Sequence, residues 1–226
     1  LHAMRGLGAQ FPKDIRSFYG HLPKGPAIPA SDLQGYLSSQ QNQYANESGE
    51  GIDLRELIFN GLVSMGQPGQ PRSLEQADED IINLVAMFFD FVLDDSSLPV
   101  PIQALVARLQ IPVLKVALND RSFFSNQNHA VRRFVNEIAT ASIGWEESDK
   151  SRQDNLFEIT ERLVHRILSS FQGDIGLFEE CHQELKTFVE EEQKRSKLVE
   201  KRTSEAAVGK AKMDHARGQV QKLLWN

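Results

Sequence analysis

The sequence has few of the residues that form cross-links or membrane spans. It contains one cysteine, Cys181, in 226 residues, which excludes an internal disulfide and is typical of a reducing compartment. Its longest apolar stretch, residues 81–93, is interrupted by Asn83 and Asp90. This stretch is also shorter than the roughly 20 residues that a membrane helix needs. We therefore expect a cytoplasmic protein that makes no membrane contact.

Proline is absent after Pro112, whereas Pro12, Pro23, Pro26 and Pro29 lie in the first thirty residues. Because proline blocks helix interiors, the second half of the chain is free to be helical. Residues 1–50 are rich in Gly, Pro, Ser and Gln. We expect them to be an irregular or linker segment, with a weak helix over residues 31–44 as the alternative.

From Asp53 onward, apolar residues recur at helical spacing, and no segment alternates like a strand. Asp53 is a candidate N-cap, Ser73 and Gln76 form a capping-box pattern, and Asn128 is a candidate cap for a later helix. The helix that ends near Asp94 is apolar nearly all round in its second half, so we expect it to be the central buried helix. The sequence predicts an all-α fold with a compact multi-helix bundle over residues 53–172.

The last part of the chain, residues 174–226, predicts a long charged helix. Glu190 faces Lys194 at i, i+4, which favours a helical ion pair. Two interpretations stay open, a coiled coil and a connector, because strict heptads are not sustained. We expect the helix to pack on the bundle through Leu177, Cys181, Leu185 and Phe188. The apolar residues near its end favour a homodimer through this helix; they are Val220, Leu223, Leu224 and Trp225.

Five short segments form a distinctive pattern: Leu109–Pro112, Lys115–Leu118, Ser122–Ser125, His129–Arg133 and Gly144–Trp145. They resemble a proteobacterial family known as domain of unknown function 1631. Ala130 departs from the family pattern, which usually has proline there. The resemblance implies an internal portion of a long cytoplasmic bacterial protein, and some members are linked to cyclic di-GMP signalling. It assigns no catalytic residue.

Catalytic and metal motifs are weak. Residues 46–51 fit N-x-S-x-x-G, half of a cyclic di-GMP signature, but the matching R-x-x-x-R and the surrounding strands are missing. Glu179 and His182 form one E-x-x-H, whereas a di-iron bundle needs two. Glu158, Glu161 and His165 share a helix face, which is more often a polar surface stripe. We expect no enzyme activity, no cofactor and no metal.

The remaining candidate site lies in the basic segment 108–133. Arg121, Arg132 and Arg133 flank Phe123 and Phe124, and such residues can clamp an anionic ligand or contact a partner. The alternative is that the two phenylalanines fill the core and that the basic segment faces the acidic segment 73–95. Net charge is −6, which disfavours nucleic acid.

The sequence therefore predicts a non-catalytic regulatory or protein-interaction module with an unidentified protein partner. One alternative is a nucleotide-sensing domain that uses the basic segment 108–133. The second alternative is an enzyme of unknown type.

Overall fold

The computed structural model describes residues 22–45, 52–143 and 150–224, with side chains in the last helix described up to Met213. Helices account for most of these ranges, which contain no β-strand and only two isolated bridges. The all-α prediction is therefore confirmed. The helices are α2 Ala30–Ala45, α3 Leu54–Ser64, α4 Gln76–Leu93, α5 Val100–Ala107, α6 Gln110–Asn119, α7 Ser122–Ser125, α8 Ala130–Ala141, α9 Lys150–Ser170 and α10 Gly176–Leu224.

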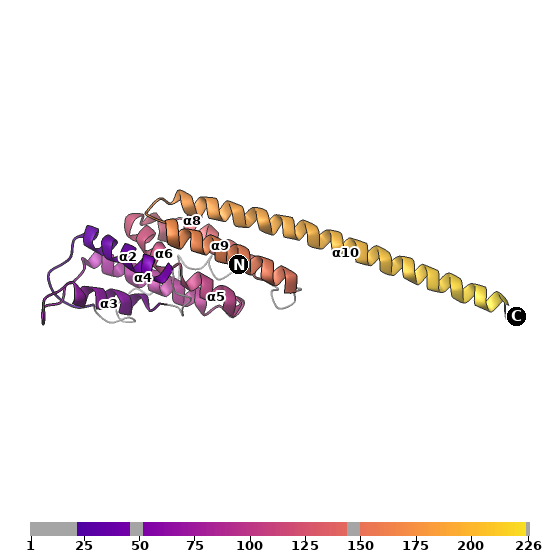
Figure 1. Cartoon of the computed structure of the whole chain (residues 1–226), viewed down its shortest axis with the longest axis horizontal. Coiled ribbons are helices and arrows are strands. Elements are labelled where there is room, and N and C mark those ends of the chain that lie inside the picture. The colour runs from indigo at the N-terminus through magenta and orange to yellow at the C-terminus, as the bar shows by residue number, and fades with distance from the viewer. Residues whose placement is uncertain (1–21, 46–51, 144–149, 225–226) are drawn as a thin grey trace. The chain divides into compact units, whose positions relative to one another are not determined.

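The chain divides into two units. The first unit ends at Leu185 and the second begins at Lys186. The first unit is the bundle, and it includes the first ten residues of α10. The second unit is the rest of α10 (Figure 1). The expected boundary at residues 172–174 stays a prediction, and the division of the chain into these two units falls about a dozen residues after it, within α10. Phe178, Cys181 and Leu185 are fully buried in the bundle, whereas Leu177 is only half-buried.

The expectation of an irregular segment over residues 1–50 is wrong for α2. Leu33 and Leu37 of this helix are buried, and α2 packs against α6 and α9. The weak helix predicted over residues 31–44 is thus real and belongs to the bundle. Only two strongly apolar positions face the core, so the sequence signal was faint. Residues 1–21 and 46–51 lie outside the described part of the chain.

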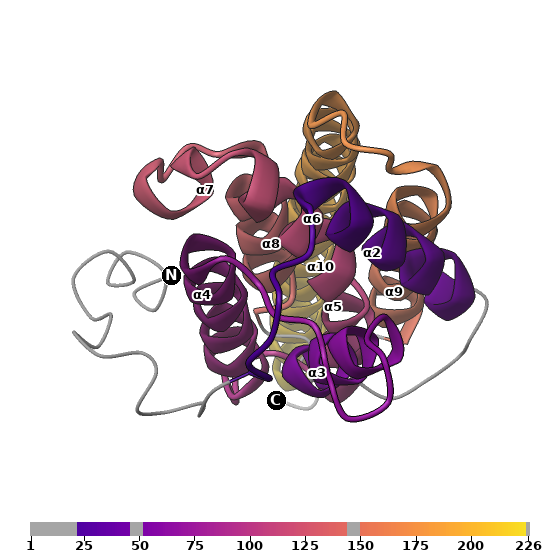
Figure 2. The ribbon, with the colours of Figure 1, turned by 90° about the vertical axis from the view of Figure 1, so that its left-hand side faces the viewer.

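The centre of the bundle is α6, not α4 as the apolar run suggested. Eight consecutive residues of α6, from Gln110 to Ala117, are buried, whereas α4 exposes Asp90 and Phe91. Figure 2 shows α6 between α4 on one side and α2 on the other. Because α6 is short and contains Lys115, its sequence looks less apolar than that of a typical central helix.

Helix starts follow the sequence at some positions and not at others. Asp53 caps α3 as predicted, since its Oδ1 accepts from the backbone N–H groups of Arg55 and Glu56, both at 3.0 Å. The capping box at Ser73 is absent, because the Ser73 hydroxyl donates to the Gly25 carbonyl at 2.6 Å. His129, not Asn128, is the N-cap of α8.

No single helix within the described ranges combines the length and apolarity needed to cross a membrane. Helices α5 and α6, which bend by 44° at their junction, meet that criterion only when taken as a pair. Both contribute buried side chains to the bundle core.

Candidate functional site

The three arginines proposed as an anion clamp have different environments. Arg121 is exposed. Arg132 is buried, and its Nη1 donates to the Phe124 carbonyl at 3.2 Å; burial lowers the pKa of its guanidinium. Arg133 is half-exposed and forms an ion pair with Glu179. The structure therefore does not bring the three guanidinium groups to one anion site.

The two phenylalanines of this segment pack into an aromatic cluster. Phe123 is 1% exposed, and its ring lies 5.5 Å from that of Phe88, 4.9 Å from that of Phe124 and 5.4 Å from that of His129. All three contacts are edge-on, the geometry that aromatic pairs prefer in cores. Phe123 thus has no face available for stacking on a base.

The acidic and basic segments meet only in part. Arg121 lies close enough to Asp78 to lower the pKa of that carboxyl, although burial and Glu75 outweigh this effect and raise it. Arg133 turns instead to α10. The expectation that the two charged segments face each other as blocks is therefore too simple.

Ion pairs hold both sides of the first turns of α10. On the α8 side, Arg133 pairs with Glu179, and His182 Nε2 lies 3.8 Å from Glu137 Oε2. On the α9 side, the carboxylates of α10 face two arginines. Arg162 Nη1 lies 2.5 Å from Glu184 Oε1, Arg166 Nη1 lies 3.4 Å from Glu184 Oε2, and Arg166 also pairs with Glu180.

This arrangement fixes the position of α10 more than it adds stability. Exposed ion pairs contribute only about 0–1 kcal/mol each, whereas burying Phe178, Cys181 and Leu185 supplies the apolar contact. Charges on both flanks specify which face of α10 turns toward the bundle. Burial also raises the pKa of the Cys181 thiol to about 11.

A buried lysine joins three helices near the end of α9. Lys115, 4% exposed, donates from Nζ to Gln41 Oε1 at 3.0 Å and to the Phe171 carbonyl at 3.4 Å. Gln41 in turn donates to the Leu168 and Phe171 carbonyls at 2.8 and 3.1 Å. No carboxylate of the described residues pairs with Lys115, and burial lowers its pKa. Its charge is offset by the negative end of α9.

Asn83 is a buried polar residue that sequence reasoning did not single out as a site. It lies on α4, is 0% exposed, and neither its Oδ1 nor its Nδ2 has a hydrogen-bond partner within the described part of the chain. Leaving a buried polar group unpaired costs about 1–3 kcal/mol. The only signal in the sequence is an amide within the apolar run 81–93.

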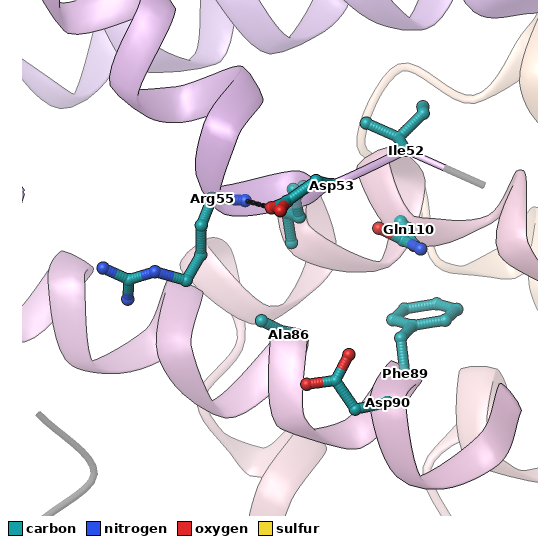
Figure 3. Close-up of a pocket in the computed structure, with 8 residues that line it drawn as sticks. Ile52, Asp53, Arg55, Ala86, Phe89, Asp90 and Gln110 are labelled. Atoms are coloured by element: carbon teal, nitrogen blue, oxygen red, sulfur yellow. Dashed lines mark hydrogen bonds between the residues drawn. The ribbon is translucent and has the colours of Figure 1, made fainter. Parts of the chain in front are cut away.

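A cavity of about 420 Å³ opens where the N-terminus of α3 meets α4 and α6. Its lining combines apolar groups with two carboxylates, a guanidinium and an amide (Figure 3). Gln110 is 5% exposed, and its side-chain amide has no hydrogen-bond partner among the described residues. The sequence did not predict this site, because its residues come from three separated segments. The lining residues are Ile52, Asp53, Leu54, Arg55, Ala86, Phe89, Asp90 and Gln110.

The other motifs occupy ordinary surface positions. Glu179 and His182 of the E-x-x-H contact α8, as described above. Glu158, Glu161 and His165 line an open surface hollow together with two arginines. The described residues contain no group of three or more His, Cys, Asp or Glu side chains that could hold a metal ion. The N-x-S-x-x-G motif and Trp145 lie outside the described ranges.

Comparisons with known proteins give one match. Residues 27–174 match the second domain of the family described as protein of unknown function DUF1631. This range contains α2 to α9 and ends before α10 begins. No curated protein and no solved structure matches the chain. Because the match covers well over half of the chain, the protein belongs to the DUF1631 family and contains its second domain.

Proposed function

We propose that this chain is a non-catalytic regulatory and protein-interaction module of a larger cytoplasmic bacterial protein. In this proposal the bundle supports the start of α10, and the remainder of α10 binds a partner. The family resemblance suggests a place in cyclic di-GMP-linked signalling. The observation that carries the proposal is the contrast between the two parts of α10.

The first part of α10 is held by buried side chains and by ion pairs on two flanks. Beyond Val189, by contrast, apolar side chains are exposed: Val199 is 61% and Met213 60% exposed, and Ala206 between them is also exposed. These three residues are spaced by seven, so they form one row along a helix, as in a coiled-coil seam. An isolated helix gains little from such residues, whereas a second helix would bury them.

The first partner that we propose is a second copy of the chain. In a homodimer, Glu205 and Lys210 would occupy positions that flank the row and pair across a parallel interface. Light scattering of the full chain should therefore give a dimer. Val199→Glu combined with Met213→Glu should give a monomer, because each change places a charge in the row.

A matched control is Val208→Glu. Val208 is 51% exposed but lies nine positions from Val199, on the opposite side of the helix, so this variant should remain a dimer. A monomeric wild-type chain would rule out self-association through this row. Affinity capture from native lysate, compared between the double variant and the Val208→Glu control, then tests a different partner. Equal capture of partners by both variants would overturn the proposal that this row of α10 binds a partner.

Calorimetry with cyclic di-GMP separates this proposal from the nucleotide-sensing alternative. We expect no binding, because Arg132 is buried and Arg133 is paired with Glu179. Saturable binding that Arg121→Ala with Arg133→Ala abolishes would favour the nucleotide sensor instead.

A further inference from the structure

The distal part of α10 has a charge opposite to that of the rest of the chain. Residues 193–213 contain seven Lys and Arg residues and two Glu residues, and all of these side chains are exposed. Residues 1–185, by contrast, contain 15 basic and 25 acidic residues. The net charge of −6 for the whole chain therefore hides a local excess of positive charge on α10, which attracts an acidic partner.

Most of the lysines in this stretch lie on one side of the helix. Lys201 follows Lys194 by seven residues and Lys212 follows Lys201 by eleven, so the three side chains lie within about 20° of one another round the helix. Exposed aliphatic side chains flank this line about 40° to either side: Leu198 is 49% and Val208 is 51% exposed. We call this surface the lysine face, and its lysines are Lys194, Lys197, Lys201 and Lys212.

The lysine face is separate from the row formed by Val199, Ala206 and Met213. That row lies about 100–140° away from Lys194 round the helix. A second helix that covers the row therefore leaves the lysine face open, and the two surfaces can be occupied at the same time.

Two features of the lysine face favour a polypeptide over a phosphate polymer. Glu205 lies among the lysines, with its Oε1 4.0 Å from Lys201 Nζ, and a uniformly negative backbone would place a phosphate against this carboxylate. A polypeptide can instead place a basic or neutral residue there. Arg195 and Arg202, whose guanidinium groups suit phosphates better than an ammonium does, lie about 80–100° away, beside the row.

The aliphatic side chains indicate the form of that polypeptide. Leu198 and Val208 are ten residues apart, which is about 15 Å along a helix, so an apolar stripe of similar length is needed to contact both. Two separated aliphatic residues are too few for a membrane-surface helix, which inserts a continuous apolar face. An acidic amphipathic helix would bury both residues and bring carboxylates beside the lysines, as charged flanks do in paired helices.

We propose that the lysine face of α10 binds an acidic amphipathic helix of a partner protein. Carboxylates of that helix pair with Lys194, Lys201 and Lys212, and its apolar stripe covers Leu198 and Val208. The proposal adds a second binding surface to α10. It does not depend on self-association through the row, so the two can fail separately.

The test uses the full chain and a labelled acidic peptide of about 21 residues, long enough to form a helix. Each heptad of the peptide carries three glutamates and one leucine, and a matched basic peptide has lysine at every glutamate. Fluorescence anisotropy at about 50 mM salt, where screening is weaker than in the cell, should show saturable binding of the acidic peptide. We expect its dissociation constant to lie below about 1 mM and the basic peptide not to bind.

Two double variants locate the binding surface. Lys194→Gln with Lys201→Gln removes two charges from the lysine face and should weaken binding of the acidic peptide by about fivefold or more. Arg195→Gln with Arg202→Gln is the matched control: it removes two charges one residue further along, on another side of the helix, and should weaken binding by less than about twofold. Val208→Glu should also weaken peptide binding although it should leave the dimer intact, which separates the lysine face from the row.

Three results would overturn the proposal. The first is no saturable binding of the acidic peptide up to about 1 mM. The second is equal weakening by the two double variants, which would indicate general attraction to a basic helix and no defined face. The third comes from a short single-stranded oligonucleotide and from phosphatidylglycerol vesicles: if either binds more tightly than the peptide and loses binding in the double lysine variant, the face belongs to a phosphate-bearing partner.

Discussion

Replacing Asn83 by leucine should stabilise this protein, although most core substitutions destabilise. The Asn83 side chain is 0% exposed, and no residue that the structure describes forms a hydrogen bond with either of its polar atoms. Leucine has the same branched skeleton with two methyl groups in place of oxygen and NH₂. The change therefore removes two unpaired groups and keeps the shape.

The magnitude follows from two opposing contributions. Each unpaired buried group costs about 1–3 kcal/mol, while the larger methyl groups introduce overpacking of about 1–3 kcal/mol. We expect a net gain of about 2 kcal/mol in the free energy of unfolding. For a chain of this size that gain raises the melting temperature by about 4–8 °C.

Differential scanning calorimetry of three variants checks this reasoning. Ile82→Leu is the matched control, because Ile82 is also 0% exposed on α4 and the change alters no polar group. It should change the free energy of unfolding by less than about 1.5 kcal/mol. Asn83→Asp should be strongly destabilising, because it introduces a buried charge. If Asn83→Leu melts below the Ile82→Leu control, the amide must be satisfied, for example by ordered water, and our reasoning is wrong.

Two further predictions concern titratable groups. Burial raises the pKa of Cys181 to about 11, so at pH 8 the native thiol should react with a disulfide reagent at a rate limited by unfolding; rapid labelling of the folded protein would contradict the burial of this side chain. Burial is also the main cause of the lowered pKa of His129, with Arg132 and Arg133 adding to it and Asp120 opposing it. The folded state therefore binds a proton on the His129 imidazole less readily than the unfolded state does. As the pH falls below the unfolded pKa of about 6.5, protonation favours the unfolded state, so the free energy of unfolding should decrease. His129→Asn, which keeps an N-cap residue, should show a smaller loss of stability between pH 7.5 and 5.5 in urea titrations, and an unchanged loss would refute the assignment.

Much of the secondary structure could be predicted because it depends on local rules. The spacing of apolar residues located the helices, and the Asp53 carboxylate caps α3 through bonds that span only three residues. The proline-free second half contains the two longest helices, α9 and α10. Where a distant partner competes with a local one, however, local rules were not enough: Ser73 bonds to Gly25, 48 residues away, and does not cap α4.

The candidate sites depended on contacts between distant segments, which no pattern in the sequence records. Gln110 is an ordinary polar residue in the sequence, and only the packing of α3 and α4 around it creates a cavity with an unpaired amide. Arg132 and Arg133 are neighbours in the sequence, but one points into the core and the other pairs with α10.

The sequence by itself determined that the chain is helical, that α3 begins after Asp53, and which family it resembles. These features depend on the backbone preferences of single residues and on spacings within a few turns. Only the tertiary structure decided that α6 is the central helix and that Lys115 lies in the core. The physical reason is that burial of a polar group depends on its partners: Lys115 is accommodated because Gln41 and the carbonyl end of α9 accept its hydrogen bonds, and these partners lie 74 and 56 residues away along the chain.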